Sequence, residues 1–111
     1  MYKVIALVRR RSGITPEQFA DYWKNVHAPL VRTTLPGLRK YVLNIVEAGR
    51  GGEPPEYDGM VELHFDDRAA AERALSSPDW LGDTRRSSTD EFLELDTILS
   101  IRAEEYVVPL Q

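Results

Sequence analysis

The sequence predicts an α+β protein of the ferredoxin-like class, in which four antiparallel strands form one sheet and the helices cover one face of it. Three observations lead to this prediction. Runs of alternating apolar residues predict strands in four places, and helix signals occur in two of the intervals between them. A chain of 111 residues is the right length for one domain. The resulting order, β-α-β-β-α-β, is the split arrangement of ferredoxin-like folds.

The first helix begins at a recognisable N-terminal signature. Thr15 is a favourable N-cap, Pro16 suits the first helical position, and Gln18 completes a capping box with Thr15. The helix is expected to run from residue 16 to about residue 26. Pro29 disfavours helical geometry at the residue before it, so the regular helix is expected to end at residues 27–29. Its large apolar side chains recur every three or four residues and predict one buried stripe, formed by Phe19, Tyr22, Trp23 and Val26.

The other elements are predicted from alternation, capping residues and turn residues. Residues 48–55 hold three glycines and two prolines and are expected to form a long surface loop. Strands are predicted at residues 2–9, 39–47, 57–65 and 95–108, with 91–96 open between loop and strand. A second helix is predicted to begin at Asp66 or Asp67, to carry Ala70, Ala74 and Leu75 on its inner side, and to end at Ser77-Pro78; a short helical turn is predicted at 79–86.

One face of the predicted sheet has no helix to cover it. Apolar residues alternate onto both sides of the first two strands, so both faces are expected to be partly buried. The helices of the chain can cover only one face. The simplest solution pairs two copies face to face, with a cleft between sheet and loops, and we therefore expect a homodimer.

Composition excludes several classes of function. With 14 basic and 18 acidic residues the net charge is −4, despite local clusters at residues 9–11 and 85–86, and this argues against a nucleic-acid binder. No stretch approaches the roughly 20 apolar residues that span a bilayer, so no membrane partner is expected. The absence of cysteine excludes disulfides, thiolate metal sites and thiol catalysis. The N-terminus lacks the features of a secretory signal, and a cytoplasmic location is expected.

The chain has only two histidines, and these are the candidate bases near neutral pH. His27 follows Tyr22 and Trp23 at the expected end of the first helix. One interpretation makes it an exposed or capping residue whose cation is favoured by the helix dipole. The other interpretation makes it a catalytic base beside an aromatic wall, although an aromatic stripe at helical spacing usually belongs to a core. From composition alone, the first interpretation is favoured by roughly two to one.

His64 and Glu62 are expected on the same face of the third strand, together with Met60 and opposite Val61, Leu63 and Phe65. A histidine and a carboxylate two residues apart can orient each other and exchange a proton with a ligand. An ordinary polar pair at the interface is the simpler interpretation. A buried carboxylate needs a partner, for which the candidates are Arg9, Arg39, Arg102 and His27.

Further polar residues are candidates for holding a ligand. Asn44 alternates with Val42 and Val46 and is expected either to bind a ligand or to satisfy a backbone group. Tyr41 lies on the opposite face from Asn44. Arg9, Arg39 and Arg102 stand near strand ends, where an arginine can bind an anion bidentately but is more often solvated.

Motifs for bound cofactors are absent from the sequence. The three loop glycines precede prolines rather than a helix, so they do not form a phosphate loop. No group of histidine and acidic residues has the spacing of metal ligands. We therefore expect neither a metal nor an organic cofactor.

The segment FADYWKNVHAPLV at residues 19–31, followed by LPGLRKYVLN at 35–44, resembles the signature of the EthD family. The resemblance continues through DGMVELHFDD at 58–67 and SSPDW at 76–80. It implies a dimeric α+β barrel in which two sheets enclose a pocket, and relatives in that superfamily commonly work without metal or organic cofactor. His27 matches the motif histidine that lies at the pocket, Tyr22 and Trp23 match its aromatic neighbours, and Pro29 matches the helix terminator. A second catalytic histidine has no match, and His64 stands where an aromatic residue is common.

The leading functional hypothesis is a cofactor-independent enzyme that isomerises, cyclises or decarboxylates a small aromatic, lactone or polyketide-like molecule. His27 and Glu62 are the candidate catalytic residues, and Tyr22, Trp23, Tyr41, Asn44 and His64 are the candidate ligand-binding residues. One alternative is a non-catalytic ligand-binding protein of a degradation pathway. Another is a small oxidoreductase or monooxygenase on the same fold; family members often carry such a label, for which this sequence holds no nicotinamide or flavin motif.

Overall fold

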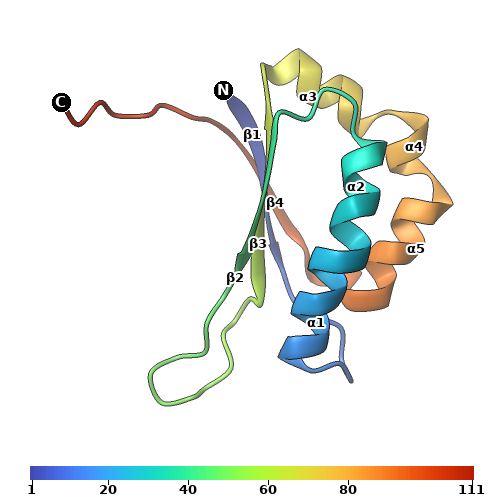
Figure 1. The fold of residues 1–111 in the computed structure, drawn as a ribbon, viewed down its shortest axis with the longest axis vertical. Helices are drawn as coiled ribbons and strands as arrows, with labels where there is room; N and C mark the ends of the chain where they lie inside the picture. The colour runs from blue at the N-terminus through green and yellow to red at the C-terminus, as the bar shows by residue number, and fades with distance from the viewer.

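A computed structural model describes residues 1–111 as a four-stranded antiparallel sheet with all the helices on one face (Figure 1). The strands lie in the order β2-β3-β1-β4, so the first strand is central and the fourth pairs with it at an edge. This arrangement confirms the predicted fold class. The elements are β1 (Tyr2–Val8), α1 (Pro16–Tyr22), η1 (Trp23–His27), α2 (Ala28–Thr34), β2 (Lys40–Ile45), β3 (Gly59–Phe65), α3 (Arg68–Leu75), α4 (Pro78–Leu81), α5 (Asp83–Phe92), η2 (Leu95–Thr97) and β4 (Leu99–Glu104).

The first helix does not end at Pro29, and that prediction is wrong. α1 passes into η1, a π-helical turn in which the N–H of Ala28 bonds to the carbonyl of Trp23, and α2 then continues to Thr34. Pro29 is the second residue of α2, which continues directly from η1 because His27 also has αR geometry. Ala28 keeps α geometry, with φ −60° and ψ −44°. We attribute the continuation of the helix past Pro29 to the wider π turn, which moves the carbonyl that the proline ring would otherwise meet.

The π turn also changes which residues are buried. An i→i+5 bond encloses one residue more than an α-helical bond. His27 therefore falls in line with Phe19 and Trp23, and only 6% of it is exposed. Val26, predicted to belong to the buried stripe, is 48% exposed. The turn thus exchanges a valine for a histidine on the inner face of the helix.

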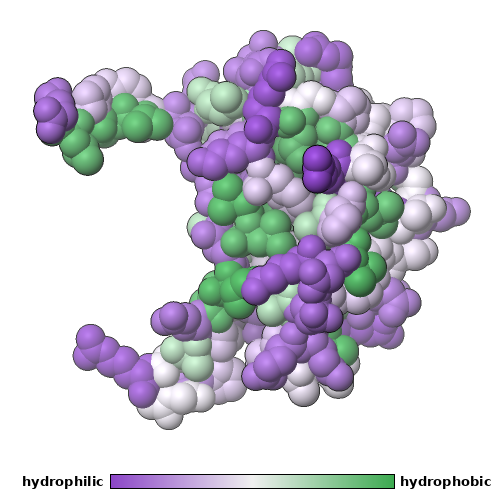
Figure 2. Space-filling model, in the orientation of Figure 1, coloured by the Kyte–Doolittle hydropathy of each residue, from purple (hydrophilic) through white to green (hydrophobic).

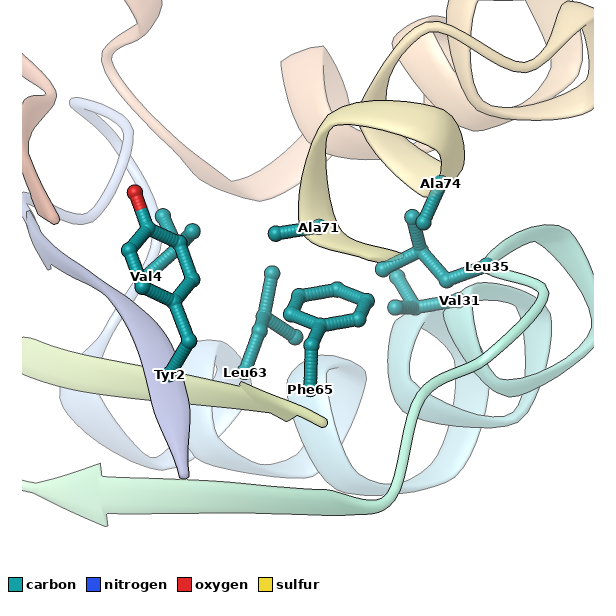
Figure 3. Close-up of a cluster of buried hydrophobic side chains, with 8 residues drawn as sticks. All are labelled: Tyr2, Val4, Val31, Leu35, Leu63, Phe65, Ala71 and Ala74. Carbon is teal, nitrogen blue, oxygen red and sulfur yellow. The ribbon is translucent and has the colours of Figure 1, made fainter. Parts of the chain in front are cut away.

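One cluster of buried side chains packs α2 and α3 onto the sheet. Figure 3 shows Leu63 and Phe65 of β3 pointing toward the residues of α3, and Phe65 is fully buried. The small side chains of Ala71 and Ala74 let α3 approach the sheet closely. Asp67 caps this helix as predicted, Ala70, Ala74 and Leu75 lie on its inner side as predicted, and Ala71 is fully buried there as well. The cluster comprises Tyr2, Val4, Val31, Leu35, Leu63, Phe65, Ala71 and Ala74.

A second cluster forms around Phe92, in a region that the sequence did not assign correctly. The sequence predicts either loop or strand at residues 91–96 and a helical turn that ends near residue 86. Instead α5 runs to Phe92, and β4 is shorter than predicted. Residues 83–92 are mostly polar and lack helical periodicity, but Ser88, Thr89 and Phe92 share the buried face of α5. The cluster comprises Val8, Phe19, Trp23, Phe92 and Leu93.

The opposite face of the sheet has no helix on it. Its apolar residues include Leu99 and Ile101 of β4, which are 46% and 47% exposed. The C-terminal segment beyond β4 and the loop between β2 and β3 both project on this side (Figure 1). Figure 2 shows apolar side chains gathered in the hollow between these two projections. None of the helices is long and apolar enough to cross a membrane.

Candidate active site

A cavity of about 310 Å³ lies between the inner face of the sheet and the helices. Its walls are mainly apolar side chains of β1 and β3, including Val4, Ala6 and Val61. Polar groups enter from the surrounding elements: His27 from η1, Tyr41 from β2, Arg85 and Thr89 from α5, and Ser100 from β4. His27 therefore faces a space inside one chain. It does not face the space that two sheets of a dimer would enclose, contrary to the expectation from the resemblance.

His27 is buried and held by a hydrogen bond. Its Nδ1 lies 2.9 Å from the Oγ of Ser88, and its ring packs on Phe92 with 4.8 Å between ring centres. Burial lowers the pKa of His27 to about 4, and the positive charge of Arg85 acts in the same direction. The imidazole is therefore neutral at pH 7. The interpretation of His27 as an exposed, positively charged capping residue is wrong.

Tyr22 reaches His27 through Ser88, because the Tyr22 hydroxyl lies 3.2 Å from the Oγ of that serine. The sequence brought Tyr22 and His27 together as candidates but did not identify Ser88, which lies 61 residues from His27 in the chain. Trp23 has a different place. It belongs to the second core cluster, 5.4 Å from the ring of Phe19, and is not among the residues that line the cavity.

Arg85 is a cation at the cavity wall that has no acidic partner. Its Nε donates to the carbonyl of Trp80 over 2.7 Å, and its guanidinium lies 4.0 Å from the centre of the Trp80 ring. No carboxylate lies within 4.0 Å of it. Burial lowers the pKa of Arg85, but an arginine stays charged at neutral pH. The sequence identifies only a local pair of arginines here, because the helical turn predicted at 79–86 does not indicate which way Arg85 points.

Tyr41 lines the cavity from β2, on the inner face of the sheet. Burial raises the pKa of its hydroxyl to about 12, against an opposing effect of the Trp23 side chain. The hydroxyl is therefore protonated at neutral pH and can donate a hydrogen bond into the cavity.

Glu62, His64 and Asn44 lie on the other face of the sheet. Glu62 accepts from Asn44 Nδ2 at 3.1 Å, and its other carboxylate oxygen lies 3.1 Å from His64 Nε2. Lys3 Nζ lies 3.3 Å from Glu62. The hydrogen bond from Asn44 is the largest cause that lowers the pKa of Glu62, with His64 and Lys3 adding to it.

The prediction of His27 as a partner of Glu62 is wrong, because the sheet separates them. Leu63 points into the helix-side core, so its neighbour Glu62 points away from it. The partners suggested for Glu62 are also corrected. Arg39 pairs with Asp66 and Arg9 with Glu56, whereas Glu62 pairs with Lys3, Asn44 and His64. Elsewhere, no three histidine or acidic side chains come together in a way that could hold a metal ion.

Comparison with known proteins places these features in a family. The model of the EthD domain matches residues 11–94. An uncharacterised 11.0 kDa protein from the thcB-thcC intergenic region of Rhodococcus erythropolis is 24% identical over 109 residues, which cover 98% of this chain and all of that protein.

Solved structures agree with the fold. An EthD family protein from Bacillus halodurans superposes with a TM-score of 0.74 at 24% identity, covering 96% of this chain and 99% of the other. A dimeric ferredoxin-like protein from Bacteroides fragilis gives 0.64 at 13% identity, covering 94% and 95%. SnoaB, a cofactor-independent oxygenase from Streptomyces nogalater, gives 0.64 at 14% identity, covering 99% and 97%. Because the family model spans most of the sequence, the chain belongs to the EthD family.

Proposed function

We propose that this protein is a cofactor-independent acid/base enzyme that acts on a small aromatic, lactone or polyketide-like molecule in the cavity beside His27. One observation carries the proposal: a neutral imidazole and an arginine without an acidic partner meet at the wall of a mainly apolar cavity. The apolar walls of the cavity can pack against the rings of such a molecule. The imidazole and the guanidinium suit a reaction in which a proton leaves and negative charge develops.

The proton transfer follows from the contacts of His27. In the tautomer that carries its proton on Nδ1, the ring donates to Ser88, and Nε2 keeps a lone pair that has no partner within the chain. Nε2 removes a proton from an acidic C–H or O–H of the substrate. Arg85 stabilises the resulting enolate or phenolate, and Ser88 and Tyr22 hold the imidazolium in place. The proton then returns to another atom of the same molecule, so an isomerisation needs no oxidant.

An oxygenase is a second candidate, and the cofactor-independent oxygenase among the structural relatives favours it. An organic anion formed by the same deprotonation can react with molecular oxygen, which then serves as the oxidant. Both candidate reactions require His27 to remove a proton from the substrate.

The role of His27 can be tested without knowing the product. Wild-type protein in D₂O is expected to accelerate deuterium exchange at one acidic position in at least one member of a panel of lactones, 1,3-diketones and phenolic ketones, followed by proton NMR. His27→Asn is expected to slow that exchange by about 100-fold or more. Val26→Asn is the matched control, because its side chain is adjacent in sequence but 48% exposed. Exchange at the wild-type rate in His27→Asn rejects His27 as the base, and saturable binding without exchange supports a binding protein.

We also propose that the protein is a homodimer joined through the open face of the sheet. Leu99 and Ile101 are half exposed there, and the apolar tail residues Tyr106, Val107, Val108 and Leu110 are at least 64% exposed. A second copy would cover both groups. Sedimentation is expected to give a dimer at micromolar concentration. Leu99→Lys combined with Ile101→Lys is expected to give a monomer, and a wild-type monomer at that concentration contradicts the proposal.

A further inference from the structure

A second hollow lies beside the His27 cavity. It is an open groove of about 480 Å³ between the outer side of η1 and α2 and the edge strand β2. Four cationic residues line it, namely Lys24, Arg32, Arg39 and Lys40. Apolar atoms of Pro29, Leu38 and Leu43 complete its walls.

Three of the four cations of this groove form no ion pair within the chain. Arg39 pairs with Asp66. Lys24, Arg32 and Lys40 have no carboxylate within 4.0 Å, although the protein has 18 acidic residues and a net charge of −4. A groove that concentrates positive charge on an acidic protein attracts an anion more strongly than a flat surface does.

The groove and the cavity share one wall. Tyr41 lines both of them and is the only residue that does. On α2, Val31 faces the cavity and its neighbour Arg32 lines the groove. A molecule that fills the cavity and extends past Tyr41 would therefore reach the cationic side chains.

We propose that the ligand is an amphipathic organic anion. Its ring system enters the cavity beside His27, and a carboxylate, sulfate or phosphate on the same molecule binds Lys24 and Arg32 in the groove. This inference rests on the proposed function, because it names the substrate class of that site. It assigns the charged end of the ligand to a place away from the reacting atoms, so the groove contributes affinity and orientation and moves no proton.

Two fluorescent probes with the same rings test the proposal. 8-Anilinonaphthalene-1-sulfonate carries an anionic group, and N-phenyl-1-naphthylamine lacks it. Wild-type protein is expected to bind the sulfonate about 10-fold more tightly than the neutral probe. Lys24→Gln combined with Arg32→Gln is expected to remove that difference and to leave the affinity for the neutral probe unchanged. Arg50→Gln combined with Arg73→Gln makes the same charge change on exposed residues outside the groove and is expected to have no effect.

The two histidines report where each probe binds. In protein with ¹³C-labelled histidine, both probes are expected to shift the His27 signal and to leave that of His64, on the other face of the sheet, in place. Equal wild-type affinity for the two probes, loss of both affinities in the groove variant, or a shift of His64 alone overturns the proposal. These measurements use binding only. Failure of the deuterium-exchange test would therefore remove His27 as a base without affecting them.

Discussion

Replacing Phe92 with alanine is expected to lower the free energy of unfolding by about 3–5 kcal/mol. Phe92 is 1% exposed, and its ring centre lies 5.2 Å from that of Tyr22 and 5.7 Å from that of Phe19. It also supports the rings of Trp23 and His27, at 6.2 and 4.8 Å. The substitution leaves a cavity at the point where α5 meets the first helix, and urea unfolding followed by circular dichroism measures the loss.

A matched variant separates lost volume from lost aromatic contact. Phe92→Leu keeps most of the apolar volume and is expected to cost less than half as much as Phe92→Ala. The alanine variant is also expected to raise the pKa of His27 toward its ordinary value, because water gains access to the ring. A loss below about 1 kcal/mol in the alanine variant would show that α5 is not held by this contact.

Acidification from about pH 6.5 to about pH 4 is expected to destabilise the protein by about 3 kcal/mol through His27 alone. The folded protein holds this histidine at a pKa of about 4, while the unfolded chain has the ordinary value of 6.5. The unfolded state therefore takes up a proton first as the pH falls. The contribution of His27 is complete above pH 6.5, declines through this interval, and declines no further below about pH 4.

The measurement is a difference between two proteins. Urea unfolding of wild type and of His27→Gln at a series of pH values cancels the titration of carboxylates such as Glu62 and Glu105, whose pKa values are also lowered. The difference in unfolding free energy is expected to shrink as the pH falls. Parallel stability curves for the two proteins would mean that His27 titrates normally and is not buried as described.

Much of the architecture could be predicted because it depends on local patterns. Alternation along β3 separated Val61, Leu63 and Phe65 from Glu62 and His64, and the structure places those sets on opposite faces. The capping box was also predictable, since Thr15 and Gln18 exchange hydrogen bonds of 2.8 and 3.1 Å. These patterns involve residues that are close together in the chain, so they can be recognised in one sequence without a structure.

The composition of the site could not be predicted in the same way. Ser88, which hydrogen-bonds His27, and Arg85, whose charge acts on it, belong to α5. The residues of this helix are mostly polar, so no periodic pattern of apolar residues predicted its full length. Pro29 predicted a helix end because residues before proline disfavour α geometry, but Ala28 has that geometry and the helix continues through the π turn. His27 and Glu62 were not predictable as lying apart, because neither the first helix nor the third strand shows in its sequence which face of the sheet the helix covers.

The π turn has a consequence for how this protein can evolve. His27 faces the cavity because the turn between Trp23 and Ala28 contains one residue more than an α-helical turn. Loss of one residue other than His27 there would restore the regular helix and keep the residues that follow in nearly the same orientation relative to Phe19, because the π turn accommodates one extra residue. The inward position of His27 therefore depends on the extra residue being held in a π turn, because the same sequence in regular α geometry would place Val26 on the inner face instead.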